Sequence, residues 1–107
     1  NALDAPVLGT NIDTSNYIQN DQPLMTAIER LKPRIIYSHL KDLRRGADGG
    51  YTVLPLGQGE LDFGAILAAY ADAGADFPLC FEFPGGADPE AAITASLAHL
   101  VRLGLPR

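Results

Sequence analysis

The sequence has one cysteine and few basic residues, and each scarcity excludes a class of protein. Cys80 has no second cysteine with which to form an internal disulfide, which suits a reducing cytoplasm. Lys and Arg total 8 against 13 Asp and Glu, which gives a formal net charge of −5. Because binding to nucleic-acid phosphates needs clustered basic side chains, we expect a cytoplasmic protein that does not bind nucleic acid.

Long hydrophobic runs, repeats and low-complexity tracts are also absent. No stretch reaches the roughly 20 apolar residues that cross a bilayer. The residues from Asn1 onward lack the charged, apolar and small-residue order of a secretion signal, so we expect no contact with a membrane. The 107 residues are 47% hydrophobic and 20% charged, which is typical of one small globular domain with a modest core.

Strand and helix patterns alternate along the chain. Apolar runs predict three strands, at residues 7–13, 34–40 and 77–83. Apolar residues at helical spacing predict three helices, which begin at the capping residues Asp21, Asp62 and Asp88 and end near Pro33, Gly74 and Gly104. Residues 41–59 are rich in glycine and charge, which predicts a loop, and within it Gly57 and Gly59 are expected to shape the turn into the next helix.

This alternation is typical of a parallel sheet, because parallel neighbours need a crossover connection such as a helix. Parallel strands are usually covered on both faces. Three strands alone would leave two open edges and one bare apolar face. We therefore predict an α/β fold with parallel strands that forms part of a larger sheet or barrel.

Each predicted strand ends in a residue of a type that binds metals: Asp13, His39 and Glu82. In a parallel α/β barrel the C-terminal strand ends face one rim, where active sites are built. Taken singly, an aspartate after a strand is usually a helix cap or turn residue, and a histidine there is more often structural. Glu82 lies between two phenylalanines, and an unpaired buried carboxylate is costly. Together the three predict a divalent metal site for Mn²⁺, Mg²⁺, Co²⁺ or Zn²⁺.

Four segments resemble the sugar phosphate isomerase/epimerase family of xylose isomerase-like TIM barrels: NIDTSNY, YSHLKD, LGQGELDF and CFEF. The resemblance implies that residues 1–107 are the C-terminal portion of such a barrel, the last three βα units of a (β/α)8 TIM barrel whose N-terminal half is missing. We expect this incomplete barrel to associate with that half or to form a homo-oligomer.

The resemblance also implies roles for single residues. In that family a Glu, an Asp, a His and a Glu on the last four strands hold the metal, for which Mn²⁺ is the first choice here. Asp13, His39 and Glu82 match the last three of these ligands, and the first glutamate would lie before Asn1. Glu82 would also be one of the two catalytic carboxylates that move a proton.

Four further residues are expected to bind substrate: Asn16, Lys41, Asp42 and Arg45. Arg45 stands six residues beyond His39, where the sugar epimerases of the family place a substrate-binding arginine. Asn16 stands where relatives often carry a histidine. Lys41 and Asp42 are expected to contact substrate or to support the metal ligands, and Asp42 to orient His39 or to pair with Lys41 or an arginine.

The resemblance implies a metal-dependent sugar or sugar phosphate isomerase or epimerase, which works by proton transfer next to a ketose carbonyl through an enediolate. Two alternatives remain: a non-catalytic TIM-barrel relative, and an endonuclease IV-like nuclease similar to the apurinic endonucleases. The nuclease is disfavoured by the acidic charge, and by Asn16 and residues 51–53, which stand where those enzymes carry zinc-binding histidines or an Asp-x-His.

Overall fold

The computed structural model describes residues 5–83 and 86–105. Its elements follow in chain order: β1 (Thr10–Asp13), α1 (Thr14–Gln19), α2 (Leu24–Leu31), the 3-10 turn η1 (Lys32–Arg34), β2 (Ile35–Leu40), β3 (Asp42–Arg45), β4 (Tyr51–Leu54), α3 (Phe63–Asp72), β5 (Leu79–Phe81) and α4 (Pro89–Arg102). No helix among the described residues is long and apolar enough to cross a membrane.

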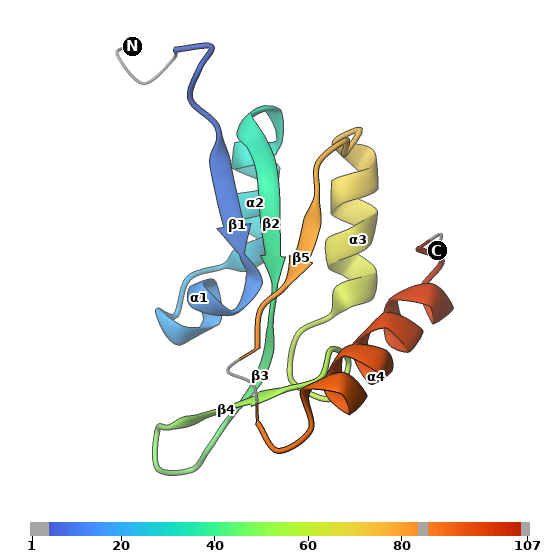
Figure 1. Ribbon diagram of the computed structural model, residues 1–107. Coiled ribbons are helices and arrows are strands. Elements are labelled where there is room, and N and C mark those ends of the chain that lie inside the picture. The colour runs from blue at the N-terminus through green and yellow to red at the C-terminus, as the bar shows by residue number, and fades with distance from the viewer. Residues whose placement is uncertain (1–4, 84–85, 106–107) are drawn as a thin grey trace.

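The predicted parallel sheet is confirmed. Its strand order is β1-β2-β5, and both pairings are parallel. In Figure 1 helix α2 lies behind β1 and β2 and helix α3 lies beside β5, while no described helix crosses the near face of β1 and β2. The near face carries alternate side chains such as Asn11 and Cys80, both of which are exposed. The three strands therefore have one covered face and one bare face.

The hydrophobic core lies between the sheet and its helices. Its fully buried members come from the strands, the helices and the turn after β4: Ile12, Ile28, Leu40, Leu56, Phe63, Ile66 and Leu100. One polar contact crosses this core, because the buried Ser38 hydroxyl on β2 donates to the backbone oxygen of Ile12 on β1 at 2.8 Å and lies 2.8 Å from the Tyr70 hydroxyl on α3. This contact ties two strands to a helix without leaving a buried hydroxyl unpaired.

The first and last strands are shorter than the sequence predicts. β1 begins at Thr10 rather than at residue 7, since Val7 is 89% exposed and does not pair with β2. β5 covers Leu79–Phe81 instead of residues 77–83. Both ends lie on open edges of the sheet, where no further strand holds them.

Two predicted helix starts differ from the structure. Helix α1 was not predicted at all, and it follows β1 directly because the Asp13 side chain caps it. The expected cap of α2, Asp21, does not cap it: Pro23 holds the N-cap position without a side-chain bond, and Asp21 adopts a φ of 52°. Asp62 and Asp88 do cap α3 and α4, and each accepts a bond from a backbone amide three residues later.

The predicted loop at 41–59 contains a hairpin. Strands β3 and β4 pair antiparallel, with Asp42 opposite Leu54 and Arg45 opposite Tyr51. The Tyr51 hydroxyl donates to the backbone oxygen of Gln19 at 3.0 Å, so the hairpin is attached to the end of α1. In Figure 1 it extends past the C-terminal ends of β1, β2 and β5.

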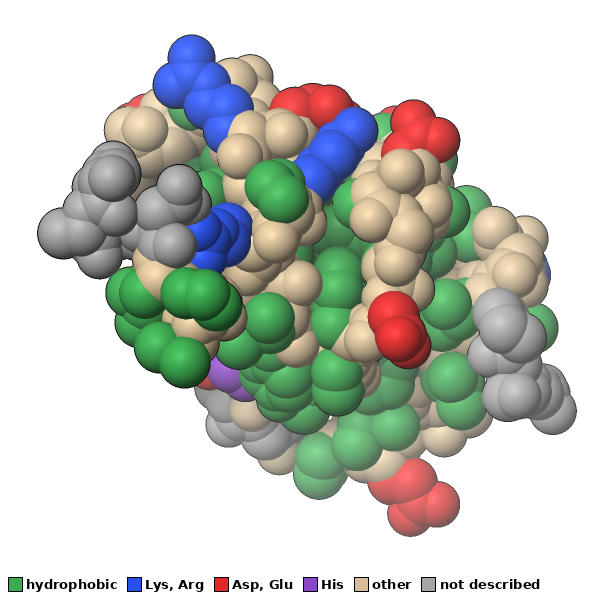
Figure 2. Space-filling view, turned by 90° about the horizontal axis from the view of Figure 1, so that it is seen from above, with side chains coloured by type: hydrophobic (Ala, Val, Ile, Leu, Met, Phe, Trp, Pro, Cys, Tyr) green, Lys and Arg blue, Asp and Glu red, His purple; other side chains and the backbone are tan. Residues whose placement is uncertain are grey.

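Hydrophobic side chains also reach the surface. Figure 2 looks onto the end of the molecule where the strands begin and shows hydrophobic side chains across the middle of that surface. Val7, Leu8 and Ile36, which lie close to the strand starts, are between 49% and 89% exposed. On α4 Leu100 is buried, whereas Ile93 and Leu97 are exposed. Contiguous exposed apolar side chains are typical of interaction surfaces.

Candidate metal centre

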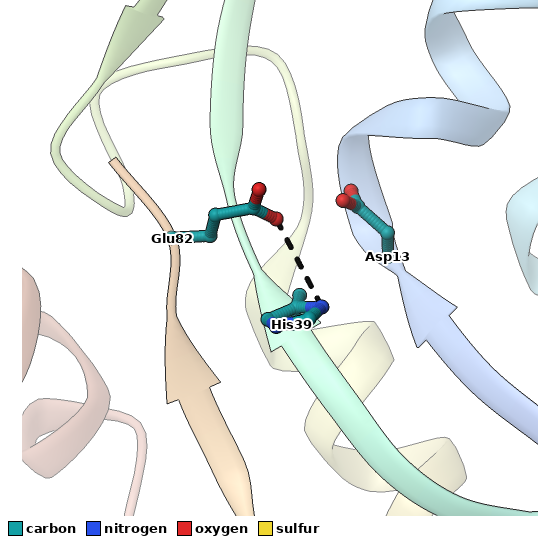
Figure 3. A group of neighbouring side chains, drawn as sticks. All are labelled: Asp13, His39 and Glu82. Carbon is teal, nitrogen blue, oxygen red and sulfur yellow. Dashed lines mark ion pairs between the residues drawn. The ribbon is translucent and has the colours of Figure 1, made fainter. Parts of the chain in front are cut away.

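The sheet register brings Asp13, His39 and Glu82 together. Asp13 pairs with His39 across β1 and β2, and the backbone amide of Glu82 donates to the oxygen of Leu40 at 3.1 Å just past β5. One ligand atom from each of the three side chains lies within 4.8 Å of the other two. Figure 3 shows the three side chains converging from three separate strand ends. The structure therefore groups the three residues as the sequence predicts.

Asp13 divides its two oxygens between two tasks. Oδ1 caps α1 by accepting bonds from the amide and hydroxyl of Ser15, both at 3.1 Å, and from the amide of Asn16 at 3.3 Å. Oδ2 lies 3.6 Å from the Lys41 ammonium. The helix-cap and metal-ligand interpretations of Asp13 are thus compatible, because the cap leaves one oxygen free to bind an ion.

The pKa of Asp13 lies below its usual value. Partial burial opposes ionisation and by itself raises the pKa, but the side-chain hydrogen bond with Glu82, the charge of the Lys41 ammonium and the bonds from Ser15 and Asn16 together outweigh it. The ionised carboxylate, which is the form that binds a metal, is therefore favoured.

His39 presents its Nδ1 to the site. Nδ1 lies 3.9 Å from Glu82 Oε2 and 3.1 Å from the side-chain nitrogen of Asn11. The edge of the Tyr37 ring meets the imidazole with the ring centroids 4.9 Å apart. The Asn11 amide can donate to Nδ1 when the neutral imidazole carries its proton on Nε2. The same tautomer can bind a metal through the Nδ1 lone pair. Sequence reasoning missed Asn11, although it lies two residues before Asp13 on a strand and so shares its face.

Lys41 lies between the two carboxylates. Its Nζ is 3.2 Å from Glu82 Oε2 and 3.6 Å from Asp13 Oδ2, and its side chain is 16% exposed. The buried Thr14 hydroxyl holds the Lys41 backbone: it donates to the oxygen at 2.7 Å and accepts from the amide at 3.0 Å. Glu82 is less enclosed than its flanking phenylalanines imply, since its side chain is 44% exposed and paired with Lys41. The expected cost of an unpaired buried carboxylate does not arise.

The structure contradicts the role that the sequence suggests for Asp42. Its side chain is fully buried, and its carboxylate accepts bonds from the backbone amides of Leu43, Gly57, Gly59 and Leu61 at 2.9 to 3.1 Å. With both oxygens occupied, it neither reaches a substrate nor orients His39. It organises the turn after β4 instead.

The glycines of that turn are needed at their positions. Gly57 has a φ of +87°, and a Cβ at Gly59 would collide with the Asp42 carboxylate and the Leu43 backbone oxygen. This agrees with the prediction that the two glycines shape the turn.

The other substrate-contact candidates lie around the centre with contacts of their own. Arg45 donates to Asp21 Oδ1 at 2.8 Å and to the oxygen of Ile18 at 2.9 Å, so its guanidinium is held by the end of α1. Asn16 is exposed in the first turn of α1. The structure places Lys41 against Asp13 and Glu82, while the side chain of Arg45 bonds to Ile18 and Asp21.

Comparison with known proteins places this arrangement in a family. A family model described as xylose isomerase-like TIM barrel matches residues 1–103. The chain belongs to this family. The crystal structure of a xylose isomerase domain protein from Planctomyces limnophilus matches with a TM-score of 0.77 and 22% sequence identity, over 94% of this chain and 37% of that chain. At this identity the likeness establishes the fold, and a comparison with curated proteins gave no match.

The chain is a partial barrel of this family. It covers 37% of the length of the solved structure that it matches. The family includes sugar isomerases and epimerases as well as endonuclease IV-like members. Its members often bind divalent metals, and the donor set here fits such an ion: two carboxylates and one imidazole at one strand-end rim.

Proposed function

We propose that the chain is the C-terminal portion of a metal-dependent sugar or sugar phosphate isomerase or epimerase. The observation that carries this proposal is the convergence of Asp13, His39 and Glu82 within 4.8 Å at the strand ends. These three residues would hold a divalent ion, for which Mn²⁺ is the first candidate because hard oxygen ligands and one imidazole suit it. When bound, such an ion polarises the carbonyl of a ketose.

Glu82 is proposed as the proton-transfer residue. Its carboxylate would take the proton from the carbon next to the ketose carbonyl, and the electron pair of that C–H bond would move toward the carbonyl oxygen to give an enediolate. In epimerisation Glu82 would keep this proton, and a second acid would deliver another proton to the opposite face of the same carbon. In isomerisation Glu82 would return the proton to the former carbonyl carbon. The half-exposed position of Glu82 at the open side of the centre is compatible with access to a substrate.

Epimerisation needs a second carboxylate on the other face of the substrate. The resemblance assigns that role to a glutamate on the preceding strand of the barrel, upstream of Asn1. We propose that further barrel strands cover the bare face and the open edges of β1 and β5. Those strands come from adjoining sequence or from a second copy of the chain, and the exposed Val7, Leu8, Ile93 and Leu97 belong to the surface that they cover.

Lys41, Arg45 and Asn16 are the proposed substrate contacts. Lys41 and Arg45 are cations near the rim that suit the hydroxyl or phosphate oxygens of a sugar. Arg45 would have to release Asp21, an exchange that an exposed ion pair allows at little cost. An endonuclease activity is not proposed, because Asn16 and residues 51–53 do not offer the additional metal ligands.

Solvent-deuterium incorporation into candidate ketoses tests the proposal. The full-length protein is stripped of metal and incubated with a set of ketoses and ketose phosphates in deuterated buffer, with and without Mn²⁺. The expected result is deuterium at the carbon next to the carbonyl of one ketose, dependent on Mn²⁺. Mn²⁺ binding without exchange in any ketose would favour the non-catalytic relative.

A further inference from the structure

The Lys41 ammonium lies between the Asp13 and Glu82 carboxylates, where a metal ion held by these residues would also bind. Its Nζ lies 3.2 Å from Glu82 Oε2, and that same oxygen is 3.9 Å from His39 Nδ1. On its other side Nζ lies 3.6 Å from Asp13 Oδ2, the oxygen that the helix cap leaves free. The ammonium therefore contacts one carboxylate oxygen of each of the two proposed acidic ligands.

The backbone of Lys41 is fixed in this position. The fully buried Thr14 hydroxyl bonds both its amide and its carbonyl oxygen, and Thr14 directly follows Asp13 in the chain. Lys41 also follows directly after β2, so the strand register that aligns Asp13 with His39 aligns the lysine as well. Lys32 offers a contrast, since its pair with Glu29 joins two positions on one helical surface.

We propose that Lys41 is the counter-ion of the metal-free centre, and that a divalent ion must displace its ammonium in order to bind. The inference rests on the metal centre of the proposed function. Without a cation, the Asp13 and Glu82 carboxylates would repel each other across the site. The ammonium relieves this repulsion, but it shares the sign of the incoming metal and so competes with it.

Displacement is physically easy for a lysine. Four rotatable carbons carry the ammonium, whose charge is readily hydrated once it turns away. Because Thr14 fixes the backbone, the displaced ammonium stays at the rim, where it can meet a substrate oxygen.

Mn²⁺ titration calorimetry on the metal-free full-length protein tests the inference, with Lys41→Met and Lys41→Gln compared with wild type. Lys41→Arg keeps the charge, and Lys32→Met removes a lysine from a carboxylate pair elsewhere. Removal of the competing cation should tighten Mn²⁺ binding at least about fivefold in Lys41→Met and Lys41→Gln. Both variants should also melt at a lower temperature in chelator and show a larger rise in melting temperature with Mn²⁺ than wild type.

The two controls should bind Mn²⁺ within about twofold of wild type. Unchanged or weaker Mn²⁺ binding in both neutral variants, with normal binding in wild type, would overturn the counter-ion role and leave the metal centre intact. Absence of Mn²⁺ binding in wild type and in every variant would overturn the metal centre, and the inference with it.

Discussion

Asp13 and His39 lie directly opposite each other in the parallel register of β1 and β2, so the pairing of two strands fixes the spacing of two proposed ligands. Oδ1 of Asp13 caps α1, and Oδ2 takes no part in the cap and faces Lys41. The sheet and the helix cap thus position the same side chain from two directions, which limits the reorganisation that metal binding requires.

The substitution Asp13→Asn tests the metal-ligand role of Asp13 separately from its helix-cap role. Asparagine is as good an N-cap as aspartate, so the free energy of unfolding should change by less than about 1 kcal/mol. Loss of the anionic ligand should weaken Mn²⁺ binding by more than about 100-fold, because loss of a mere supporting partner already costs about 10- to 100-fold. Titration calorimetry and thermal melting measure the two effects.

Asp62→Asn is the matched control, since Asp62 caps α3 through an equivalent bond to Ala65 but is not one of the clustered ligands. It should leave Mn²⁺ binding unchanged. Equal metal affinities in Asp13→Asn and Asp62→Asn would show that Asp13 is only a helix cap.

Asp42→Asn should destabilise the fold. An amide nitrogen would replace one of two oxygens that together accept four backbone amide bonds, which places donors against donors in a buried site. We expect a loss of about 3 kcal/mol or more in the free energy of unfolding, measured by chemical denaturation. Asp48→Asn, at the exposed hairpin tip where Asp48 accepts one bond from Gly50, should cost less than about 1 kcal/mol. A similar cost for both would contradict the role given to Asp42.

Much of this arrangement follows from local sequence patterns. The strand–helix alternation predicted the parallel sheet, and polar residues at apolar strand ends predicted the cluster of Asp13, His39 and Glu82. The β3–β4 hairpin was missed because residues 41–59 carry loop-forming glycines and charges. Its placement depends on bonds from Tyr51 and Arg45 to α1, which no local pattern reveals.

Asp42 shows a second limit of the sequence. It stands three residues after His39 and directly after Lys41, both of which lie at the metal centre, and so it was assigned to substrate or ligand support. Its true partners are amides of residues 43, 57, 59 and 61. A buried carboxylate of this kind is recognised only when the returning turn is seen in space.

The buried Tyr70 predicts how stability depends on alkaline pH. Burial raises the pKa of Tyr70 above its ordinary value of 10.0, and the bond with Ser38 only partly opposes this. The neutral phenol is therefore favoured in the folded state. Its contribution is complete below the unfolded pKa of 10.0 and is lost as the pH rises through the folded pKa.

Tyr70→Phe should cost about 1 kcal/mol at neutral pH, because one buried hydrogen bond is lost while Ser38 keeps its bond to Ile12. The stability gap between wild type and Tyr70→Phe should then narrow above pH 10, as followed by urea denaturation. Tyr51→Phe, which removes an exposed hydroxyl, should lose stability above pH 10 as wild type does. If the difference in unfolding free energy between wild type and Tyr70→Phe stays constant to high pH, the pKa of Tyr70 is not raised in the folded state.

Arg45→Ala should affect substrate rather than metal. Its guanidinium is proposed to hold substrate oxygens, so KM should rise by about tenfold while Mn²⁺ affinity stays within about twofold of wild type. Arg44→Ala is the neighbouring control, since Arg44 donates to the backbone oxygen of Gln58 and should leave KM unchanged. Equal kinetic effects of the two substitutions would assign Arg45 to holding the hairpin on α1.

The most direct measurement compares proton exchange in wild type, Glu82→Gln and Glu29→Gln of the full-length protein, each saturated with Mn²⁺. Glu82→Gln keeps the shape of the side chain but removes the charge that binds the ion and accepts the proton. Glu29→Gln removes an exposed carboxylate of the Lys32 pair. The account predicts solvent deuterium in the ketose with wild type and Glu29→Gln, and none above background with Glu82→Gln. Deuterium incorporation by Glu82→Gln at the wild-type rate would contradict it.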